Sequence, residues 1–131
     1  MASNTTDLQT PANRVIGLGS AKDGTGHWWS QRLSSIALIP LTFAFVIPFA
    51  QALGGGYEAV TALYQNPLHA IIAVLFLGVT FHHHQQGLQV VIEDYVHSKG
   101  ARTAMLVVNV LVNGALAVAG IFSVAKIAFG G

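Results

Sequence analysis

The sequence predicts an all-α integral membrane protein with three transmembrane helices, its N-terminus in the cytoplasm and its C-terminus in the periplasm. Composition and the arrangement of apolar residues predict this class. Hydrophobic residues make up 53% of the 131 residues and charged residues only 8%, whereas about a quarter of the residues of a soluble domain are charged. The apolar residues also form three runs, each long enough for a helix to cross a bilayer.

The small charge and the absence of cysteine exclude several classes of function. A formal net charge of +1 creates no basic field that would attract nucleic acid. The chain has no cysteine, which excludes disulfides, thiolate nucleophiles, iron–sulfur ligation and cysteine zinc sites. Any metal chemistry must therefore rest on histidine.

The first 26 residues predict a polar N-terminal arm, followed by a membrane domain over residues 27–131. Ser, Thr, Asn, Asp and Gly dominate the arm, and no apolar segment precedes a cleavage motif, so it is not a signal peptide. It carries too little apolar surface to fold alone. The absence of an Arg-rich presequence favours the bacterial inner membrane over the mitochondrial one.

The first apolar run predicts a transmembrane helix over residues 33–53. No charged residue occurs in it, and its length matches the roughly 20 residues that a membrane helix needs. Pro40 and Pro48 lie inside the run, so we expect a kinked helix. Three glycines, 54–56, then end this helix and begin a loop that extends to Asn66.

The second run predicts a helix over residues 67–95 that carries polar residues into the membrane. It begins at Pro67, a favourable first-turn residue. Five polar residues, His-His-His-Gln-Gln at 82–86, interrupt it before apolar residues resume. A helix that stopped at Phe81 would be too short to cross, so the polar residues must lie at membrane depth and face protein or a cofactor.

The third run predicts a helix over residues 103–125 with a face suited to helix packing. Asn109 and Asn113 lie four residues apart, on one side of a helix. Small residues follow them and would allow close approach of another helix: Gly114, Ala115, Ala119 and Gly120. We interpret this face as a helix–helix contact.

The positions of the basic residues predict the orientation. Five of the six precede the first span or lie between the second and third: Arg14, Lys22, Arg32, Lys99 and Arg102. The sixth, Lys126, follows the third span. The loop over residues 54–66 has none. By the positive-inside rule, the N-terminus and the second loop are cytoplasmic, and the C-terminus is periplasmic.

The three consecutive histidines point about 100° apart on a helix, so they cannot form one three-ligand site. A closed zinc site would also need further convergent ligands, which the neighbourhood lacks. Haem needs only one imidazole nitrogen and room for a flat macrocycle. His83 supplies the imidazole, and Gly87, one turn further on the same side, supplies the room. The alternative, a histidine that hydrogen-bonds between helices, stays open.

A second polar group marks the end of the second span, where Glu93, Asp94 and Tyr95 precede His97. Asp94 follows His83 by eleven residues, which is about 16 Å along a helix and nearly the same face. A phenol hydroxyl beside a carboxylate is a suitable donor to a carbonyl group. An ordinary polar helix end is the alternative interpretation.

Two segments together resemble the hydrophobic membrane anchor of succinate dehydrogenase, respiratory complex II. Residues 82–95, HHHQQGLQVVIEDY, resemble the family's second helix, with histidine, three residues, glycine, and then Gln-Val-x-x-x-Asp-Tyr. Residues 27–35, HWWSQRLSS, resemble its entry to the first helix. With the three-span layout, the resemblance covers about residues 27–125.

This resemblance implies a non-catalytic subunit of an enzyme complex that oxidises succinate and passes the electrons to ubiquinone in the membrane. The flavoprotein and iron–sulfur subunits would hold the other redox groups. Haem b would be shared with the companion membrane anchor of the complex. The rival hypothesis is a small histidine-containing transporter or metal-binding membrane protein.

The resemblance also assigns roles to four residues. It implies that His83 is an axial ligand of haem b, and that Tyr95, assisted by Asp94, hydrogen-bonds the quinone head group. Arg32 matches an arginine near the haem propionates and the quinone pocket, a role that suits its charge. A register shift of one residue would move the ligand to His82 or His84, so these two alternatives stay open.

Overall fold

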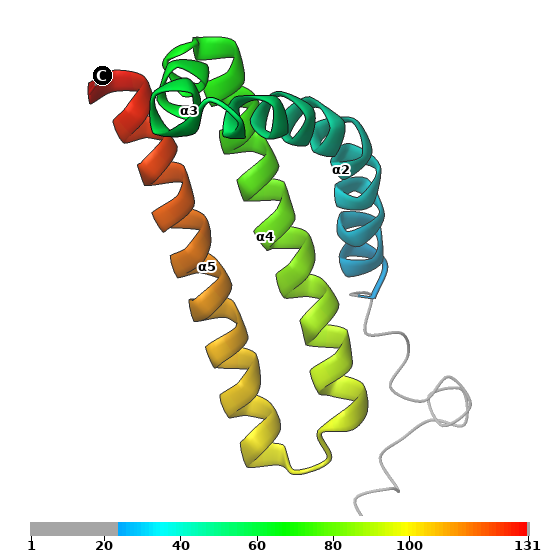
Figure 1. The fold of residues 1–131 in the computed structure, drawn as a ribbon. Coiled ribbons are helices and arrows are strands. Elements are labelled where there is room, and N and C mark those ends of the chain that lie inside the picture. Colours follow the sequence, from blue (N-terminus) through cyan, green and yellow to red (C-terminus); the bar gives the residue numbers. More distant parts are fainter. Residues whose placement is uncertain (1–23, 131) are drawn as a thin grey trace, which may run out of the picture.

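A computed structural model describes residues 24–130, which form four helices: α2 (Gly24–Leu53), α3 (Gly56–Gln65), α4 (Pro67–Tyr95) and α5 (Lys99–Gly130) (Figure 1). Three of them are long and apolar enough to cross a membrane: Thr25–Leu53, Pro67–Tyr95 and Lys99–Gly130. Long apolar helices therefore cover all three predicted spans. Helix α2 begins at Gly24, before the predicted start at residue 33, and α5 extends beyond the predicted range 103–125 at both ends. Apart from positions 24–26, which begin α2, the predicted N-terminal arm lies outside the described residues.

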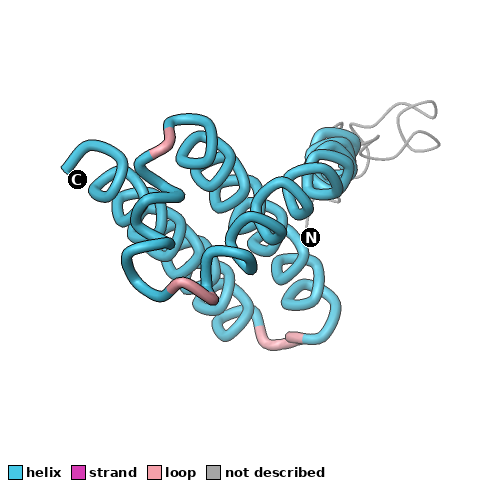
Figure 2. Tube along the Cα trace, turned by 45° about the horizontal axis from the view of Figure 1, so that its top comes forward, coloured by secondary structure: helices cyan, strands magenta, loops and turns pink. Residues whose placement is uncertain are grey.

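Helix α4 is the centre of the bundle. It packs against α2 on one side and α5 on the other, while the backbones of α2 and α5 do not approach each other closely. Figure 1 shows α4 in green between the blue-to-cyan α2 and the orange α5, and Figure 2 shows the same arrangement from a tilted direction. Side chains on opposite sides of α4 therefore meet different helices.

Both ends of α4 are defined by local chemistry. The Asn66 side-chain oxygen accepts a hydrogen bond from the Leu68 amide at 2.9 Å, and Pro67 occupies the first turn, where its missing N–H costs nothing. At the other end, Arg102 Nε donates to the Val96 carbonyl at 2.8 Å. Residues 82–86 remain helical between these ends, so the predicted span 67–95 is confirmed.

Helix α2 continues through both of its prolines. Pro40 and Pro48 lie inside the helix, and Figure 1 shows α2 bending in its second half. Proline removes one backbone hydrogen bond and its ring crowds the preceding turn, which is the usual cause of such a bend. The kink expected from the sequence is present.

Helix α3 lies in the segment that we expected to be a loop. Gly56 adopts a φ of 73°, a conformation that favours glycine and lets the chain turn between α2 and α3. The ten residues from this turn onward are amphipathic, and Val60, Leu63 and Tyr64 pack toward the bundle. This packing stabilises a helix too short to be stable alone.

Aromatic rings fill the end of the bundle beside α3. Phe45 stacks on Phe76 with 4.4 Å between ring centroids and on Phe49 with 5.6 Å. Tyr64 stacks on Phe45 at 6.3 Å, and its burial raises the pKa of its hydroxyl. Buried Ala73 lies in the same cluster. We call the end of the bundle that contains α3 and these rings, as far as Leu77 on α4, the aromatic half.

Helix α5 presents Asn109, Asn113 and Val124 to its neighbours as buried side chains. Gly120 lies against Leu77, whose Cδ1 would be 3.2 Å from an added Cβ, so close approach is used there. Gly114, Ala115 and Ala119, which we expected on the same face, are exposed. The prediction was wrong for these three because the buried positions Asn109, Asn113 and Val124, together with Gly120, form one stripe along the helix, and the three exposed residues project away from it.

Candidate functional site

The polar residues of α4 are divided between its two neighbours. His82, His83 and Gln86 form hydrogen bonds to α2. His84 and the Gln85 carbonyl are bonded to α5. We call the part of the bundle from His82 to the α4–α5 loop the histidine half. Its polar groups are mostly paired across helix interfaces, as polar groups at membrane depth must be.

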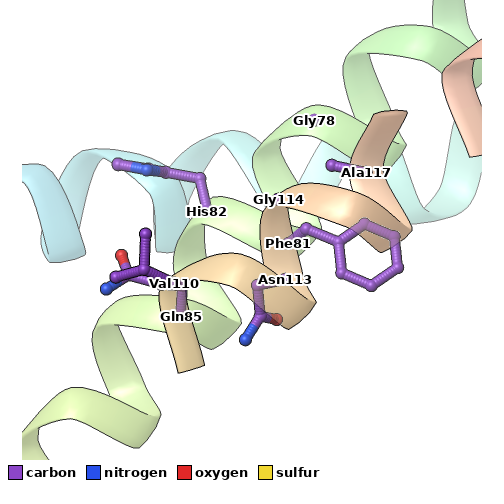
Figure 3. A pocket seen from close by; sticks show the side chains of 8 residues that line it. All are labelled: Gly78, Phe81, His82, Gln85, Val110, Asn113, Gly114 and Ala117. Atoms are coloured by element: carbon purple, nitrogen blue, oxygen red, sulfur yellow. The ribbon is translucent and has the colours of Figure 1, made fainter. Parts of the chain in front are cut away.

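Ser30 of α2 engages His82 through the outer nitrogen of the imidazole. The Ser30 hydroxyl lies 3.0 Å from His82 Nε2, and it also accepts a hydrogen bond from Gln86 Nε2 at 2.7 Å. Figure 3 shows the His82 side chain directed toward α2 and away from Phe81. The Nε2 atom of His82 is therefore occupied by a protein partner.

Ser34 of α2 engages His83 through the inner nitrogen instead. Ser34 Oγ lies 2.9 Å from His83 Nδ1 and donates to the Gln31 carbonyl at 3.0 Å. A hydroxyl has one hydrogen and a carbonyl can only accept. Both bonds form together only if His83 Nδ1 carries the proton and donates to Ser34. Nε2 of the neutral ring then keeps its lone pair, and it has no hydrogen-bond partner within residues 24–130.

His84 faces the other way and belongs to a network with α5. The Asn113 amide nitrogen donates to the Asn109 carbonyl at 2.9 Å and to Asn109 Oδ1 at 2.7 Å. Asn113 Oδ1 consequently accepts from His84 Nδ1 at 2.7 Å. Asn109 in turn donates to the Gln85 carbonyl at 2.8 Å. The predicted role of the two asparagines in helix–helix contact is confirmed.

The chain offers a ligand atom at His83 but does not enclose a large group there. A cavity of about 290 Å³ lies between α4 and α5 (Figure 3), and His82 lines it while His83 does not. A Cβ added to Gly87 would meet only Gln31 Nε2, at 3.8 Å, so packing within this chain does not demand glycine. A flat group on His83 fits these features if another polypeptide completes its pocket.

Arg32 lies between Ser30 and Ser34 in sequence but on the opposite side of α2, because two residues turn a helix by about 200°. Its guanidinium carbon lies 5.5 Å from the centroid of the Trp28 ring. Trp28 packs edge to face with Trp29, and both indoles are about half exposed. The structure therefore places Arg32 at the depth of the histidines without bringing it to them.

Asp94 and Tyr95 lie at the exposed end of α4. The Tyr95 side chain is 77% exposed, and Asp94 and His97 are exposed as well. Tyr95 follows His83 by twelve residues of continuous helix, which is about 18 Å. The structure thus keeps the two predicted sites apart and leaves the second one open at the surface of this chain.

Comparison with known proteins decides the family. Residues 6–120 match the model of the succinate dehydrogenase/fumarate reductase transmembrane subunit. The chain belongs to this family. The resemblance seen in residues 27–35 and 82–95 is therefore confirmed.

Individual relatives of this membrane anchor belong to the same kind of subunit. This chain is 35% identical over 121 residues to the succinate dehydrogenase hydrophobic membrane anchor subunit of Paracoccus denitrificans, and the alignment covers 92% of this chain and 93% of that protein. It is 27% identical over 104 residues to that of Rickettsia bellii, with 79% and 82% covered. The membrane anchor subunit of Reclinomonas americana is 29% identical over 84 residues, with 62% and 70% covered. No solved structure matches the chain.

The sequence interpretation gave no role to Ser30 and Ser34, the partners of His82 and His83 in this membrane anchor. A signal was present. The two serines lie four residues apart at the start of an apolar span, which places them on one face of a helix. Hydroxyls at that depth need partners, and the polar stretch of α4 was the nearest source of them.

Proposed function

We propose that this membrane anchor supplies His83 as an axial ligand of haem b and Tyr95 as a hydrogen-bond donor to ubiquinone, within a complex that passes electrons from succinate to the quinone. The observation that carries the proposal is the arrangement of the imidazole nitrogens. His83 is the histidine on the α2 side whose Nε2 keeps its lone pair. Haem b, when bound, supplies a one-electron carrier within the membrane.

The neighbouring histidines are less suited to the iron. His82 Nε2 contacts Ser30, so that nitrogen would have to leave its partner before binding a metal. His84 also donates through Nδ1, to Asn113 Oδ1, and so keeps its own Nε2 lone pair, but it faces α5 and not the α2 side on which His83 meets Ser34. We assign His82 and His84 to helix packing, the usual role of polar side chains between membrane helices.

Charge and exposure at the end of α4 support the quinone role. Lys99 and Arg102 follow Tyr95 closely in sequence, and Lys126 is the single basic residue near the other end of α5. By the positive-inside rule, Tyr95 lies at the cytoplasmic face and the C-terminus is periplasmic. A phenol that is exposed in the isolated chain has its hydroxyl free for a carbonyl oxygen, and Asp94 adds an acceptor beside it.

The open surfaces of the chain support specific partners. The companion membrane anchor would close the pocket beside His83 and give the second haem ligand, because His83 does not line the cavity between α4 and α5 within residues 24–130. The iron–sulfur subunit would cover Asp94 and Tyr95, and the flavoprotein would bind to it. Arg32 is unpaired with any acid within the described residues, so its guanidinium is available to a propionate or a quinone oxygen. The location that we propose for the complex is the bacterial inner membrane.

The experiment that tests the ligand is His83→Ala in the purified complex. We expect loss of the reduced b-type absorbance band, because alanine removes the imidazole that binds the iron. His82→Ala is the matched control and should retain the band. An unchanged band in His83→Ala, or loss only in His82→Ala or His84→Ala, contradicts the assignment.

The rival hypothesis of a small transporter or metal-binding protein has less support. No group of three or more His, Cys, Asp or Glu side chains is arranged to hold a metal ion between residues 24 and 130. Copurification separates the two hypotheses. Tagged chain should bring down a flavoprotein and an iron–sulfur protein in equal amounts; a chain that purifies alone in mild detergent would favour the rival.

A further inference from the structure

Ser34 is hydrogen-bonded to His83, the proposed haem ligand, from the neighbouring helix α2. Its side chain is only 7% exposed, and its hydroxyl joins His83 Nδ1 at 2.9 Å to the Gln31 carbonyl at 3.0 Å. The Gln31 carbonyl accepts a hydrogen bond from the Ser34 hydroxyl, so the Ser34 oxygen is left as an acceptor for the imidazole N–H of His83. The two hydrogen bonds therefore run in one direction: His83 on α4 donates to Ser34 on α2, and Ser34 donates to the Gln31 carbonyl.

We infer that Ser34 is a positioning residue for the haem: it holds the His83 ring in one tautomer and one orientation and makes Nε2 a stronger electron donor. The inference rests on the proposed ligand role of His83. An acceptor on the far nitrogen of a metal-bound imidazole fixes the ring and raises the basicity of the ligating nitrogen. Stronger donation favours ferric over ferrous iron, so Ser34 lowers the reduction potential of the haem.

Ser35 provides a matched control in the next position. Its hydroxyl donates to the same Gln31 carbonyl, at 2.7 Å, but has no histidine partner. Ser35→Ala therefore removes a hydroxyl from the same turn of α2 while leaving the Ser34–His83 bond intact. A difference between the two alanine variants isolates the bond to the histidine from any effect on the helix.

The experiment is a redox titration of the b-type absorbance in the purified complex. In Ser34→Ala the ferrous-to-ferric ratio at a fixed ambient potential should rise by up to about tenfold, which is a shift of about 59 mV for one electron. Ser34→Thr, which keeps a hydroxyl, should restore the original midpoint. Ser35→Ala should not move it. Ser34→Val, nearly isosteric with threonine, replaces alanine if that variant does not assemble.

Variants at the other histidine partners show which ring the iron uses. Ser30→Ala removes the partner of His82, and Asn113→Ala removes the partner of His84. A shift in either of these with no shift in Ser34→Ala overturns the inference. Equal midpoints in the alanine, valine and threonine variants of Ser34 also overturn it.

Failure of the inference is distinguishable from failure of the proposed function. If His83→Ala loses the band but every Ser34 variant titrates like the original complex, His83 remains the ligand and Ser34 has no role in its chemistry. If His83→Ala keeps the band, the ligand assignment itself fails.

Discussion

The two halves of the bundle are held together by different forces. In the aromatic half, Phe45 stacks on three rings from α2, α3 and α4, and no interhelical side-chain hydrogen bond is present among its described residues. In the histidine half, helix contacts run through Ser34 to His83 and through Asn113 to His84. The difference teaches that stacked rings hold the helices in one half, whereas hydrogen bonds between side chains hold them in the other.

The largest expected effect on stability is in the aromatic half. Phe45→Ala removes one partner from three aromatic contacts and leaves a cavity, which should lower the free energy of unfolding by about 2 kcal/mol. We expect a lower melting temperature of the purified complex, measured by circular dichroism on heating, and, if His83 holds haem b as proposed, an unchanged b-type spectrum before melting.

Phe43→Ala is the control on the same helix, because Phe43 is 62% exposed and lies outside the stack. If Phe43→Ala and Phe45→Ala lowered the melting temperature equally, the stack would have no special role in holding the helices. A changed haem spectrum in Phe45→Ala at low temperature would show that the aromatic half also affects the histidine half, so that the two are not independent.

Tyr95→Phe tests the opposite end of the comparison. If Tyr95 donates to the quinone as we propose, removal of its hydroxyl should reduce the rate of quinone reduction by about tenfold, equivalent to about 1.4 kcal/mol. Succinate-dependent reduction of a soluble dye should stay the same, and so should the melting temperature. Equal losses with quinone and dye would show that Tyr95 has no part in the quinone site.

Asn113→Leu tests whether the hydrogen bonds of the histidine half also stabilise it. The variant leaves His84 Nδ1 and Asn109 Oδ1 without partners, while Asn109 still donates to the Gln85 carbonyl. An interhelical hydrogen bond in a membrane is worth about 0.6 kcal/mol. We expect a loss of about 1 kcal/mol in stability, less than for Phe45→Ala. A larger loss of stability than in Phe45→Ala would show that the hydrogen bonds, rather than the stacked rings, contribute most to holding the helices together.

The smallest effect is expected for Arg102, which caps α4 through the Val96 carbonyl. Arg102→Gln should cost about 0.5 kcal/mol, because water replaces the lost donor at an exposed helix end. Hydrogen exchange of the last turn of α4 would report the change. Faster exchange at His83 as well would mean that the two ends of the histidine half open together.

The sequence predicted the spans well because membrane helices follow simple constraints. Pro67 and the acidic end at Asp94 and Tyr95 bound α4 at the residues expected, and the need for a full crossing required the helix to continue through the histidines. Helix α3 was missed because Gly54, Gly55 and Gly56 indicated a break and nothing local required a helix afterwards. Its stability comes from contacts of Tyr64 with Phe45 and Phe49, which are distant in sequence.

The candidate site was predictable in its residue types but not in its pairing. The spacing of His83 and Gly87 marked one face of α4, yet it did not show that Ser34 is the partner of His83 or that Arg32 lies on the far side of α2. Pairing depends on the rotation of two helices about their axes, and an apolar span that is hydrophobic all round gives little information about that rotation.

The division of hydrogen bonds on α4 also has a consequence for synthesis of the protein. A polar stretch of five residues is costly to place in a bilayer without partners. The partners of His82, His83 and Gln86 lie on α2, which the ribosome completes first, whereas the partner of His84 lies on α5, which it completes last. An inserting α4 therefore meets the partners of three of these side chains on a helix that is already made, whereas His84 stays unpaired until α5 is inserted.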